Sequence, residues 1–235
     1  NFLPSFMGTH LEKEIKALEG VLNNPNKPVA AIIGGSKVST KIDVINFLLK
    51  KMDIIIIGGA MANTFVAAKG LDVGTSLFEK ECIYLAKELI EKSQNNNCNL
   101  ILPTDFIISK NLKKNAEHTT ANFDSLPHNM MALDIGPKSI ELVNKNINNC
   151  KTILWNGPLG AFETYPFDKG TNKVASHVSS LTKQKKILSV AGGGDTVSAL
   201  NNAKVLNDFS YVSTAGGAFL EWLEGKVLPG IEPIS

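Results

Sequence analysis

The stretch KKILSVAGGGDTVSAL, residues 185–200, joins a short apolar run to three consecutive glycines and then to a segment with helical spacing. Each glycine loses more conformational freedom on folding than alanine does, at roughly 0.5–1 kcal/mol per position. A corner selected only for stability would therefore contain fewer glycines. Glycines let backbone N–H groups approach a ligand closely, and the start of a helix carries partial positive charge. This stretch therefore predicts a βα unit whose corner is shaped for an anion.

Four other glycine-rich corners follow strand-like runs elsewhere in the chain. They are IIGGSKVSTK (32–41), IIIGGAMANT (55–64), LWNGPLGAFE (154–163) and YVSTAGGAFL (211–220). One such corner says little about a ligand, because glycine also ends strands for steric reasons. In an open parallel sheet, however, ligands bind beyond the carboxyl ends of the strands. Five corners at one rim of one sheet predict a shared anion-binding site.

Continuous apolar runs alternate with amphipathic segments along most of the chain. Strands are expected at residues 28–33, 53–57, 99–102, 131–135, 152–155, 186–190 and 209–212, and helices include 10–22, 42–51, 79–92, 139–149, 171–181 and 197–203. Runs without polar alternation are typical of strands buried on both faces. The alternation predicts an α/β fold, a doubly wound parallel sheet with helices on both faces in a Rossmann-like three-layer α/β/α arrangement. The Asn-rich stretches 93–99 and 111–129 are expected to be loops.

Composition and charge argue against several classes of protein. The 235 residues are 43% hydrophobic and 20% charged, with a formal net charge of +2, so neither a nucleic-acid nor a membrane partner is expected. The longest apolar run is far too short to cross a bilayer. Cys82, Cys98 and Cys150 are scattered, which favours free thiols in the cytoplasm. Neither they nor the histidines have the spacing of a zinc site.

Two lysines and an Asp-Thr pair at these corners are candidates for binding the anion. A helix is expected to begin near Ser36, so that Lys37 and Lys41 share one face and lie in its first turns, where the helix dipole disfavours cations. An anionic ligand would compensate for this. Asp195 is either a helix N-cap or a carboxylate that orients Mg²⁺ on a polyphosphate. Thr196 can equally cap the helix or contact phosphate.

Other motifs narrow the type of ligand. Neither the P-loop pattern nor the G-x-G-x-x-G pattern of dinucleotide-binding proteins occurs. Glu163 lies in a loop where its carboxylate can reach ribose hydroxyls or remain solvated. Trp155, Phe65 and Phe162 are expected to be core residues rather than ligand contacts. All 24 basic residues are lysine, so the bidentate arginine clamp common at phosphate and carboxylate sites has no counterpart in this sequence.

Seven motifs, in this order, resemble the C-terminal half of phosphoglycerate kinases. They are GGSKVSTKI, GGAMANTF, LPTDF, LDIGP, WNGPLGAFE, GGGDT and STAGGAFLEWLEGKVLPG. The resemblance covers essentially the whole chain and implies an ATP-dependent phosphotransferase of glycolysis with a carboxyl group as acceptor. Such enzymes transfer phosphate reversibly between 1,3-bisphosphoglycerate and ADP, giving 3-phosphoglycerate and ATP. The resemblance implies that this half binds ADP or ATP with Mg²⁺ as cofactor.

The resemblance also assigns roles to individual residues. The residues expected to bind the nucleotide are Gly35, Ser36, Lys37, Lys41, Gly58, Gly59, Ala132, Leu133, Asn156, Pro158, Glu163, Gly192, Gly193, Gly194, Asp195 and Thr196. Those expected to act on the transferring phosphoryl group are Lys37 and the backbone amides of Gly193, Gly194, Gly216 and Gly217. Within this set, residues 35, 36 and 132 would line the adenine slot and Glu163 would bind the ribose. Lys41 would hold the terminal phosphates, and Asp195 would act through Mg²⁺.

The resemblance finally implies a division into parts. Residues 1–25 would be an interdomain helix with its lead-in, residues 26–224 the nucleotide-binding domain, and residues 225–235 a tail that packs on an N-terminal substrate domain outside this chain. That domain would bind the triose phosphate, so the chain alone is expected to be inactive and monomeric. Two alternatives stay open at this point: a non-catalytic α/β module that binds a phosphorylated small molecule, and a nucleotide-dependent kinase with another acceptor.

Overall fold

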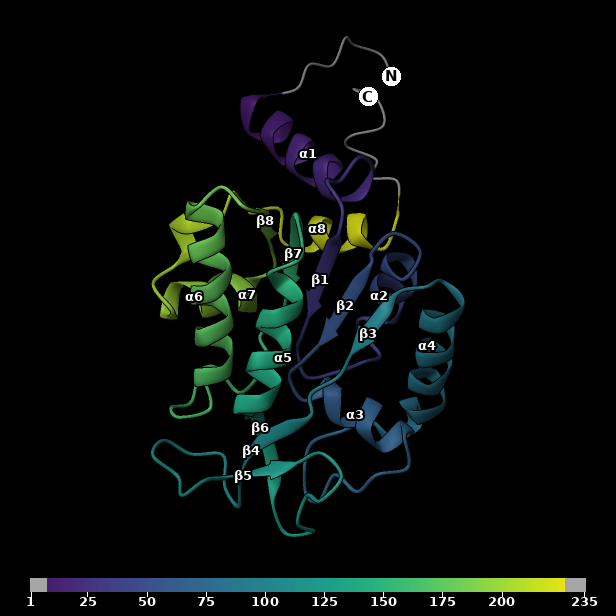
Figure 1. Cartoon of the computed structure of the whole chain (residues 1–235), viewed down its shortest axis with the longest axis vertical. Helices are drawn as coiled ribbons and strands as arrows, with labels where there is room; N and C mark the ends of the chain where they lie inside the picture. Colours follow the sequence, from purple (N-terminus) through teal and green to yellow (C-terminus); the bar gives the residue numbers. More distant parts are fainter. Residues whose placement is uncertain (1–7, 227–235) are drawn as a thin grey trace.

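Six parallel strands form the central sheet in the computed structural model, which describes residues 8–226 (Figure 1). They are β1 (Val29–Ile33), β2 (Ile54–Ile57), β3 (Asn99–Ile101), β7 (Thr152–Asn156), β8 (Leu188–Ala191) and β9 (Tyr211–Val212). The strand order is β3-β2-β1-β7-β8-β9, and every neighbouring pair is parallel. The chain therefore extends the sheet in one direction from β1 and in the other from β7. Ligands bind in such sheets at the point where the order reverses, which here lies between β1 and β7.

Helices cover both faces of this sheet (Figure 1). One face packs against α1 (Thr9–Leu22), α2 (Ile42–Leu48), α3 (Met61–Ala68), α4 (Ile83–Asn95) and α8 (Gly217–Leu223), and the other against α5 (Pro137–Ile147), α6 (Lys169–Lys183) and α7 (Gly194–Asn202). Along β1, Ala31 and Ile33 belong to the first core and Ala30 and Ile32 to the second. Successive side chains of a strand point to opposite faces, which explains why β1 is buried throughout. The predicted doubly wound, three-layer α/β class is confirmed.

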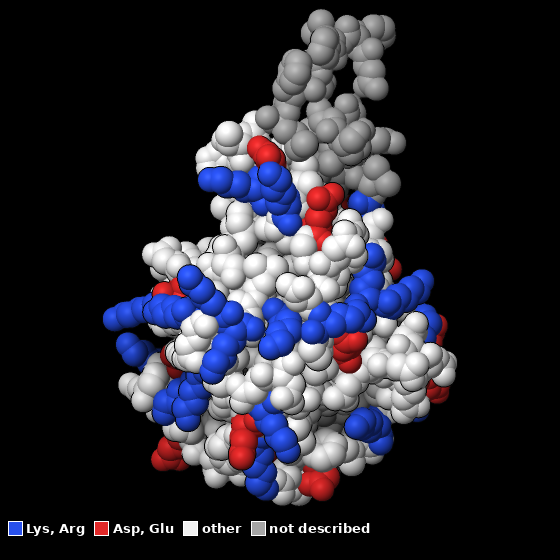
Figure 2. Space-filling view, turned by 45° about the horizontal axis from the view of Figure 1, so that its top comes forward, with Lys and Arg blue, Asp and Glu red and all other residues white. Residues whose placement is uncertain are grey.

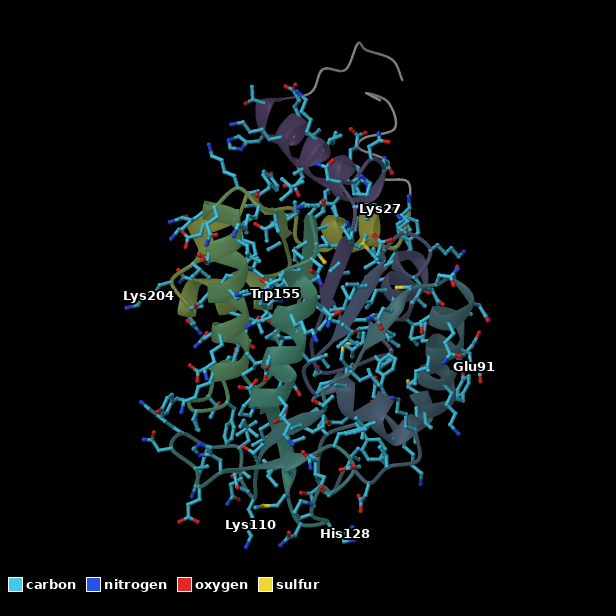
Figure 3. The ribbon with its side chains drawn as sticks, viewed as in Figure 1. Lys27, Glu91, Lys110, His128, Trp155 and Lys204 are labelled. Carbon is cyan, nitrogen blue, oxygen red and sulfur yellow. The ribbon has the colours of Figure 1, made fainter. Side chains whose placement is uncertain are left out.

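The largest fully buried side chain among the described residues is Trp155 on β7, which is 1% exposed (Figure 3). Its indole Nε1–H donates a hydrogen bond to the carbonyl oxygen of Gly157 at 2.8 Å. Phe65 on α3 is fully buried, so the predicted core placement of these two aromatic residues is confirmed. The charged side chains lie outside this core: Figure 2 shows lysines in a band across the visible face, with acidic side chains scattered between them.

A second, smaller sheet lies beside the carboxyl end of the main one (Figure 1). Its strands β4 (Asp105–Ser109), β5 (Thr119–Asn122) and β6 (Met131–Ile135) pair antiparallel in the order β5-β4-β6. The sequence predicted the strand at 131–135 but placed it in the parallel sheet, which is wrong. The prediction of a loop over 111–129 is wrong where it includes β5. That strand is exposed or half-buried along its whole length, so its sequence TTAN has no apolar signal.

The helix expected from Ser36 begins instead at Ile42. The preceding segment forms a turn, in which the backbone N–H of Lys41 donates to the carbonyl oxygen of Val38 at 2.8 Å. The carboxylate of Glu79 holds this turn from outside, accepting hydrogen bonds from the Ser39 backbone N–H at 2.9 Å and from its hydroxyl at 2.5 Å. The Lys37 and Lys41 side chains therefore do not share a helical face. A contact from a distant acidic residue fixes this segment, and local spacing could not predict it.

Helix α1 confirms the predicted helix at 10–22, and its Leu18 and Val21 side chains are fully buried in the same core as β1. Tyr211 of β9 also holds this helix, because its hydroxyl donates a hydrogen bond to the Glu14 carboxylate at 2.7 Å. Of the lead-in and tail expected at 1–25 and 225–235, residues 1–7 and 227–235 lie outside the described part of the chain. Within residues 8–226, no helix has the length and hydrophobicity needed to span a bilayer.

Candidate functional site

The glycine corners that follow β1, β2, β7, β8 and β9 gather at the carboxyl rim of the parallel sheet. The backbone N–H of Gly34 donates to the carbonyl oxygen of Asn156 at 2.9 Å, and that of Gly59 to Leu159 at 2.9 Å. The Asn156 side-chain Nδ2 donates to the carbonyl oxygen of Gly192 at 2.7 Å. The ring of Phe219, from the helix after β9, packs directly on Gly192. The expectation that five corners converge is confirmed.

Two of these glycines are required for the close contact of the β1 and β7 corners. A Cβ atom at Gly34 would lie 1.9 Å from the carbonyl oxygen of Pro158, and one at Gly157 would lie 2.2 Å from that of Gly34. Gly157 also has a φ of +97°, which residues with a side chain rarely adopt. The high glycine content of the rim thus reflects the approach of one backbone to another as well as access for a ligand.

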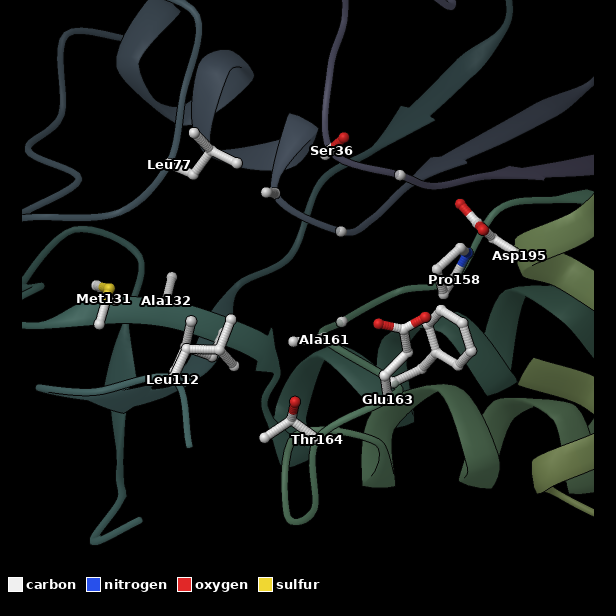
Figure 4. A pocket seen from close by; sticks show the side chains of 16 residues that line it. Ser36, Leu77, Leu112, Met131, Ala132, Pro158, Ala161, Glu163, Thr164 and Asp195 are labelled. Atoms are coloured by element: carbon white, nitrogen blue, oxygen red, sulfur yellow. The ribbon is translucent and has the colours of Figure 1, made fainter. Parts of the chain in front are cut away.

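A cavity of about 340 Å³ opens at this rim, between the parallel sheet and the small antiparallel sheet (Figure 4). One wall comes from the β1 and β2 corners, and the other from β6 and the loop after β7. The lining residues are Gly35, Ser36, Gly59, Ala60, Leu77, Leu112, Met131, Ala132, Leu133, Pro158, Gly160, Ala161, Phe162, Glu163, Thr164 and Asp195. A space of this size suits a ligand as large as a nucleotide.

The two ends of the cavity differ in chemistry (Figure 4). At one end, Leu77 and Leu112 are 60% and 51% exposed and approach from opposite walls. This end offers apolar surface that suits a planar base. At the other end lies the Asp195 carboxylate, in the first turn of α7. The position of Glu163 between the two ends suits a hydroxyl-bearing group.

A chain of hydrogen bonds joins Lys41 to the same rim. The Lys41 Nζ donates to Oδ1 of Asn156, whose Nδ2 in turn donates to Gly192. Burial lowers the pKa of Lys41, while the negative charges of Asp195 and Glu224 oppose that shift. The ammonium group is therefore positioned and partly desolvated near the Asp195 end of the cavity. Such a cation attracts a phosphate more strongly than a solvated lysine does.

The sequence left two alternatives for Asp195, and its position favours the ligand-binding one. The cap position of α7 is Gly193, and no side chain caps the helix there. The Asp195 carboxylate is exposed and lines the cavity. Thr196 differs from it, because its hydroxyl accepts a hydrogen bond from the Gly157 N–H at 2.7 Å and its side chain is 1% exposed. Thr196 thus fixes the β7 corner.

Lys37 lies outside the set that lines the cavity, on the exposed turn before α2. The positive charge of Lys37 acts on Glu79. Burial raises the pKa of Glu79, but hydrogen bonds from Ser39 and the charge of Lys37 leave this pKa below its ordinary value. The Lys37 side chain is exposed to solvent on the turn that follows the β1 corner.

All of the other predicted residues except Gly193 fall into three groups. Those that line the cavity are Gly35, Ser36, Gly59, Ala132, Leu133, Pro158, Glu163 and Asp195. Those that are buried in the rim beside it are Gly58, Asn156, Gly192 and Thr196. Those with open space next to their Cα atoms are Gly194, Gly216 and Gly217. Gly193 has a φ of +97° and packs against the Asn156 side chain.

Several lining residues were not predicted from the sequence, chiefly Leu77, Leu112, Met131 and Thr164. Phe162 was predicted to belong to the core; it is 9% exposed and also lines the cavity. The available signal was the presence of leucines in otherwise polar loops. The local sequence does not connect the Leu77 and Leu112 loops with the glycine corners; Thr164 directly follows the corner at 154–163 and Met131 begins a predicted strand, but neither residue type indicates a ligand contact.

The fold and the site together define an α/β ligand-binding domain of the doubly wound class, with its cavity at the switch point of the sheet. The chain belongs to the phosphoglycerate kinase family, since the model of the family described as "Phosphoglycerate kinase" matches residues 1–226. This assignment agrees with the resemblance of the seven motifs. It gives no support to a non-catalytic module.

Individual relatives show the same similarity. The chain is 53% identical over 230 residues to a phosphoglycerate kinase of Brucella melitensis, covering 98% of this chain and 58% of the relative. It is 50% identical, with the same coverage, to that of Rhizobium meliloti. The solved structure of phosphoglycerate kinase from Coxiella burnetii is similar with a TM-score of 0.91 at 43% identity, covering 96% of this chain and 57% of that one. The Pyrococcus horikoshii structure gives 0.81 at 26% identity. The chain thus spans about 58% of the length of the curated relatives it matches.

Proposed function

We propose that this chain is the nucleotide-binding half of a phosphoglycerate kinase of glycolysis. The whole enzyme transfers a phosphoryl group reversibly between 1,3-bisphosphoglycerate and ADP, giving 3-phosphoglycerate and ATP. One observation carries the proposal for this half: a single cavity runs from an apolar slot at Leu77 and Leu112 to the Asp195 carboxylate at the start of α7. A nucleotide has the same arrangement, with a planar base at one end and charged phosphates at the other.

We assign the base of ADP or ATP to the slot between Gly35 and Ser36 on one side and Ala132, Leu133 and Pro158 on the other. All five residues line the cavity. Glu163 would accept hydrogen bonds from the ribose hydroxyls, because its carboxylate lies between the two ends of the cavity (Figure 4). A carboxylate accepts strong hydrogen bonds from hydroxyl donors.

The phosphates are assigned to the opposite end. The Lys41 ammonium group would bind the terminal phosphates, held in place by Asn156. The backbone amides of Gly193 and Gly194 at the start of α7 would donate hydrogen bonds to phosphate oxygens, as helix N-termini commonly do. Gly58 and Gly59 let neighbouring corners approach one another beside this end, and Gly192 leaves room for the ring of Phe219.

The residues present fit a magnesium ion that takes most of its ligands from phosphates and water. Asp195 would supply one carboxylate oxygen to such an ion. Within residues 8–226, no group of three or more His, Cys, Asp or Glu side chains could form a cage of its own for a metal. One or two carboxylates are the usual protein contribution when Mg²⁺ is bound together with substrate phosphates. When bound, the ion would neutralise charge on the phosphates.

The chemistry left to this chain is positioning and electrostatic stabilisation. An acyl phosphate is already activated, so transfer requires in-line placement and stabilisation of a loose, metaphosphate-like group. We propose that Lys37 contacts the transferring group, because it is exposed at the rim and free to reach it. The amides of Gly193, Gly194, Gly216 and Gly217 would cover its oxygens; three of these glycines have open space beside them.

We further propose that the triose phosphate binds to a domain outside this chain. The chain spans about 58% of the length of its relatives, and the residues that line its cavity include no basic side chain that could hold a triose phosphate. Residues 1–25 would be the interdomain helix with its lead-in, residues 26–224 the nucleotide-binding domain, and residues 225–235 a tail that packs on the substrate domain. The isolated chain would then be an inactive monomer. The whole protein would work in the cytoplasm, where its buried cysteines stay reduced.

Calorimetric titration of the 235-residue chain tests the proposal. We expect Mg-ADP and Mg-ATP to bind and 3-phosphoglycerate to give no heat. Binding of Mg-ADP should weaken when EDTA removes the metal, because Asp195 then repels the phosphates. Tight binding of 3-phosphoglycerate without any binding of nucleotide would contradict the proposal.

A further inference from the structure

Asp134 is a buried carboxylate beneath the floor of the cavity. It lies on β6 and is 2% exposed. Its Oδ2 accepts a hydrogen bond from the backbone N–H of Gly170 at 2.6 Å, and its Oδ1 accepts one from the N–H of Ile135 at 2.9 Å. Gly170 is the second residue of α6, whose N-cap residue Asp168 makes no side-chain cap bond. Asp134 therefore caps this helix from a strand of the other sheet.

The same carboxylate is in close contact with the loop that follows β7. A Cβ atom at Gly160 would lie 2.1 Å from Oδ1 of Asp134, so only glycine can approach so closely there. The next residue, Ala161, donates its N–H to the carbonyl oxygen of Leu133 at 2.8 Å. Leu133, Gly160 and Ala161 all line the cavity, whereas Asp134 does not. One side chain thus joins β6, the β7 loop and the N-terminus of α6 directly behind the lining.

The Asp134 carboxylate loses hydration in this buried position. Burial raises the pKa of Asp134 well above its ordinary value, and the hydrogen bonds from Gly170 and Ile135 only partly offset the effect. Nearby Asp168 raises it further. The ionised form is thus disfavoured. Each carboxyl oxygen nevertheless accepts one N–H group, whereas an amide would direct an N–H donor at one of them.

We propose that Asp134 is a positioning residue for the nucleotide cavity. Its side chain holds the β7 loop and α6 against β6 and so sets the spacing of the walls around the base. The inference rests on the proposed function, since it concerns the binding of the same nucleotide. It predicts that replacing Asp134 weakens the binding of the base and leaves the binding of the phosphates unchanged. The Asp195 end is formed by α7 and the β8 corner, which Asp134 does not contact through any of its hydrogen bonds.

The neighbouring strand provides a matched control. Asp105 of β4 is 1% exposed and caps α5 in the same way, accepting the N–H of Lys138 at 3.0 Å and that of Ser139 at 2.7 Å. It contacts Gly136 as closely as Asp134 contacts Gly160. Asp105 and its partners do not line the cavity. Asp105→Asn should therefore share the loss of stability of Asp134→Asn without affecting the site.

The experiment is a calorimetric titration of the wild-type chain, Asp134→Asn and Asp105→Asn with Mg-ADP and with Mg-tripolyphosphate, alongside their melting temperatures. We expect both variants to melt at lower temperature, but only Asp134→Asn to weaken Mg-ADP binding, by about tenfold. Its affinity for Mg-tripolyphosphate, which has no base, should stay within twofold of that of the wild type. Equal loss of affinity for both ligands, or unchanged affinity for Mg-ADP, would overturn the inference.

A second variant applies if Asp134→Asn does not fold. Gly170→Ala places a Cβ atom 2.4 Å from Oδ1 of Asp134 and displaces α6 from it, and Gly170 does not line the cavity. We expect the same selective loss of Mg-ADP affinity, and unchanged binding would again overturn the inference. A wild-type chain that binds tripolyphosphate but no nucleotide would overturn the proposed function as well.

Discussion

Lys41 and Asn156 are 115 residues apart in the sequence, and the Lys41 Nζ donates a hydrogen bond to Oδ1 of Asn156. The contact spans the switch point of the sheet, because Asn156 ends β7 and Lys41 belongs to the segment that follows β1. The Nδ2 atom of Asn156 in turn donates a hydrogen bond to the carbonyl oxygen of Gly192 in the β8 corner. Three corners of the rim thus share one polar network, in which Lys41 is partly desolvated.

Replacing Asn156 by alanine should weaken both the fold and the site. The substitution leaves the carbonyl oxygen of Gly192 and the Lys41 ammonium without this partner, and an unsatisfied buried group costs about 1–3 kcal/mol. We therefore expect the free energy of unfolding to fall by about that amount in urea denaturation, and Mg-ADP affinity to fall as well. Asn146→Ala, which removes a local helix contact, is the control and should leave the affinity unchanged. Wild-type affinity in Asn156→Ala would show that the network has no role in the site.

Asp195→Asn should weaken nucleotide binding in a metal-dependent manner. With Mg²⁺ present we expect Mg-ADP affinity to fall by about tenfold, because a carboxylate oxygen is lost from the ion. In EDTA the variant should bind ADP at least as well as the wild type, since the repulsion between carboxylate and phosphates is removed. Asp124→Asn, an exposed residue before β6, should behave as the wild type under both conditions. An equal effect with and without metal would mean that Asp195 acts on the fold.

Lys37→Ala separates transfer from binding. Lys37 is exposed outside the cavity lining, so its loss should leave Mg-ADP affinity within about twofold of the wild type. In the whole enzyme, however, we expect the turnover number to fall by roughly a hundredfold or more, because the lysine is assigned to the transferring group. Steady-state kinetics on the full-length protein provide the measurement, with Lys50→Ala as the surface control. Equal losses in affinity and turnover would show that Lys37 binds the ground state.

The cysteines should react slowly in the folded chain. Burial raises the pKa of Cys98 and of Cys150 to about 11, and the nearby Asp53 charge adds to the effect. At pH 8 both thiols are therefore almost fully protonated, and the thiolate is the reactive form. We expect iodoacetamide labelling, followed by mass spectrometry, to be slow in buffer and fast in denaturant. The rate in buffer should rise about tenfold per pH unit. Complete labelling of the native chain within minutes at pH 8 would contradict this.

Much of the fold was predictable because buried parallel strands leave a continuous apolar signal. The run at 28–33 became β1, whose five residues are all buried. Each of the five glycine corners follows such a run, so the parallel arrangement itself brings them to one rim. For the same reason the sequence predicted Asp195 at this rim, while it left open whether the residue caps a helix or binds a ligand. The physical link is that a parallel sheet puts all its carboxyl ends on one edge.

The features of the fold and of the site that the sequence did not predict depend on contacts between distant segments. The turn before α2 replaces the expected helix because Glu79 binds Ser39 from 40 residues away. β5 was missed because it is largely exposed and carries no hydrophobic pattern. Leu77 and Leu112 reach the cavity from loops whose path the local sequence does not specify. Local periodicity contains no information on such contacts, which explains why the contribution of these two leucines to the base end of the site appeared only in the structure.

A crystal structure of the chain with Mg-ADP tests the central claim most directly. We expect the base between Ala132 and Pro158, near Leu77 and Leu112, with the phosphates at the start of α7 and the metal ion in contact with Asp195. A nucleotide bound in the reverse direction, or at any surface away from the β1 and β7 corners, would contradict it.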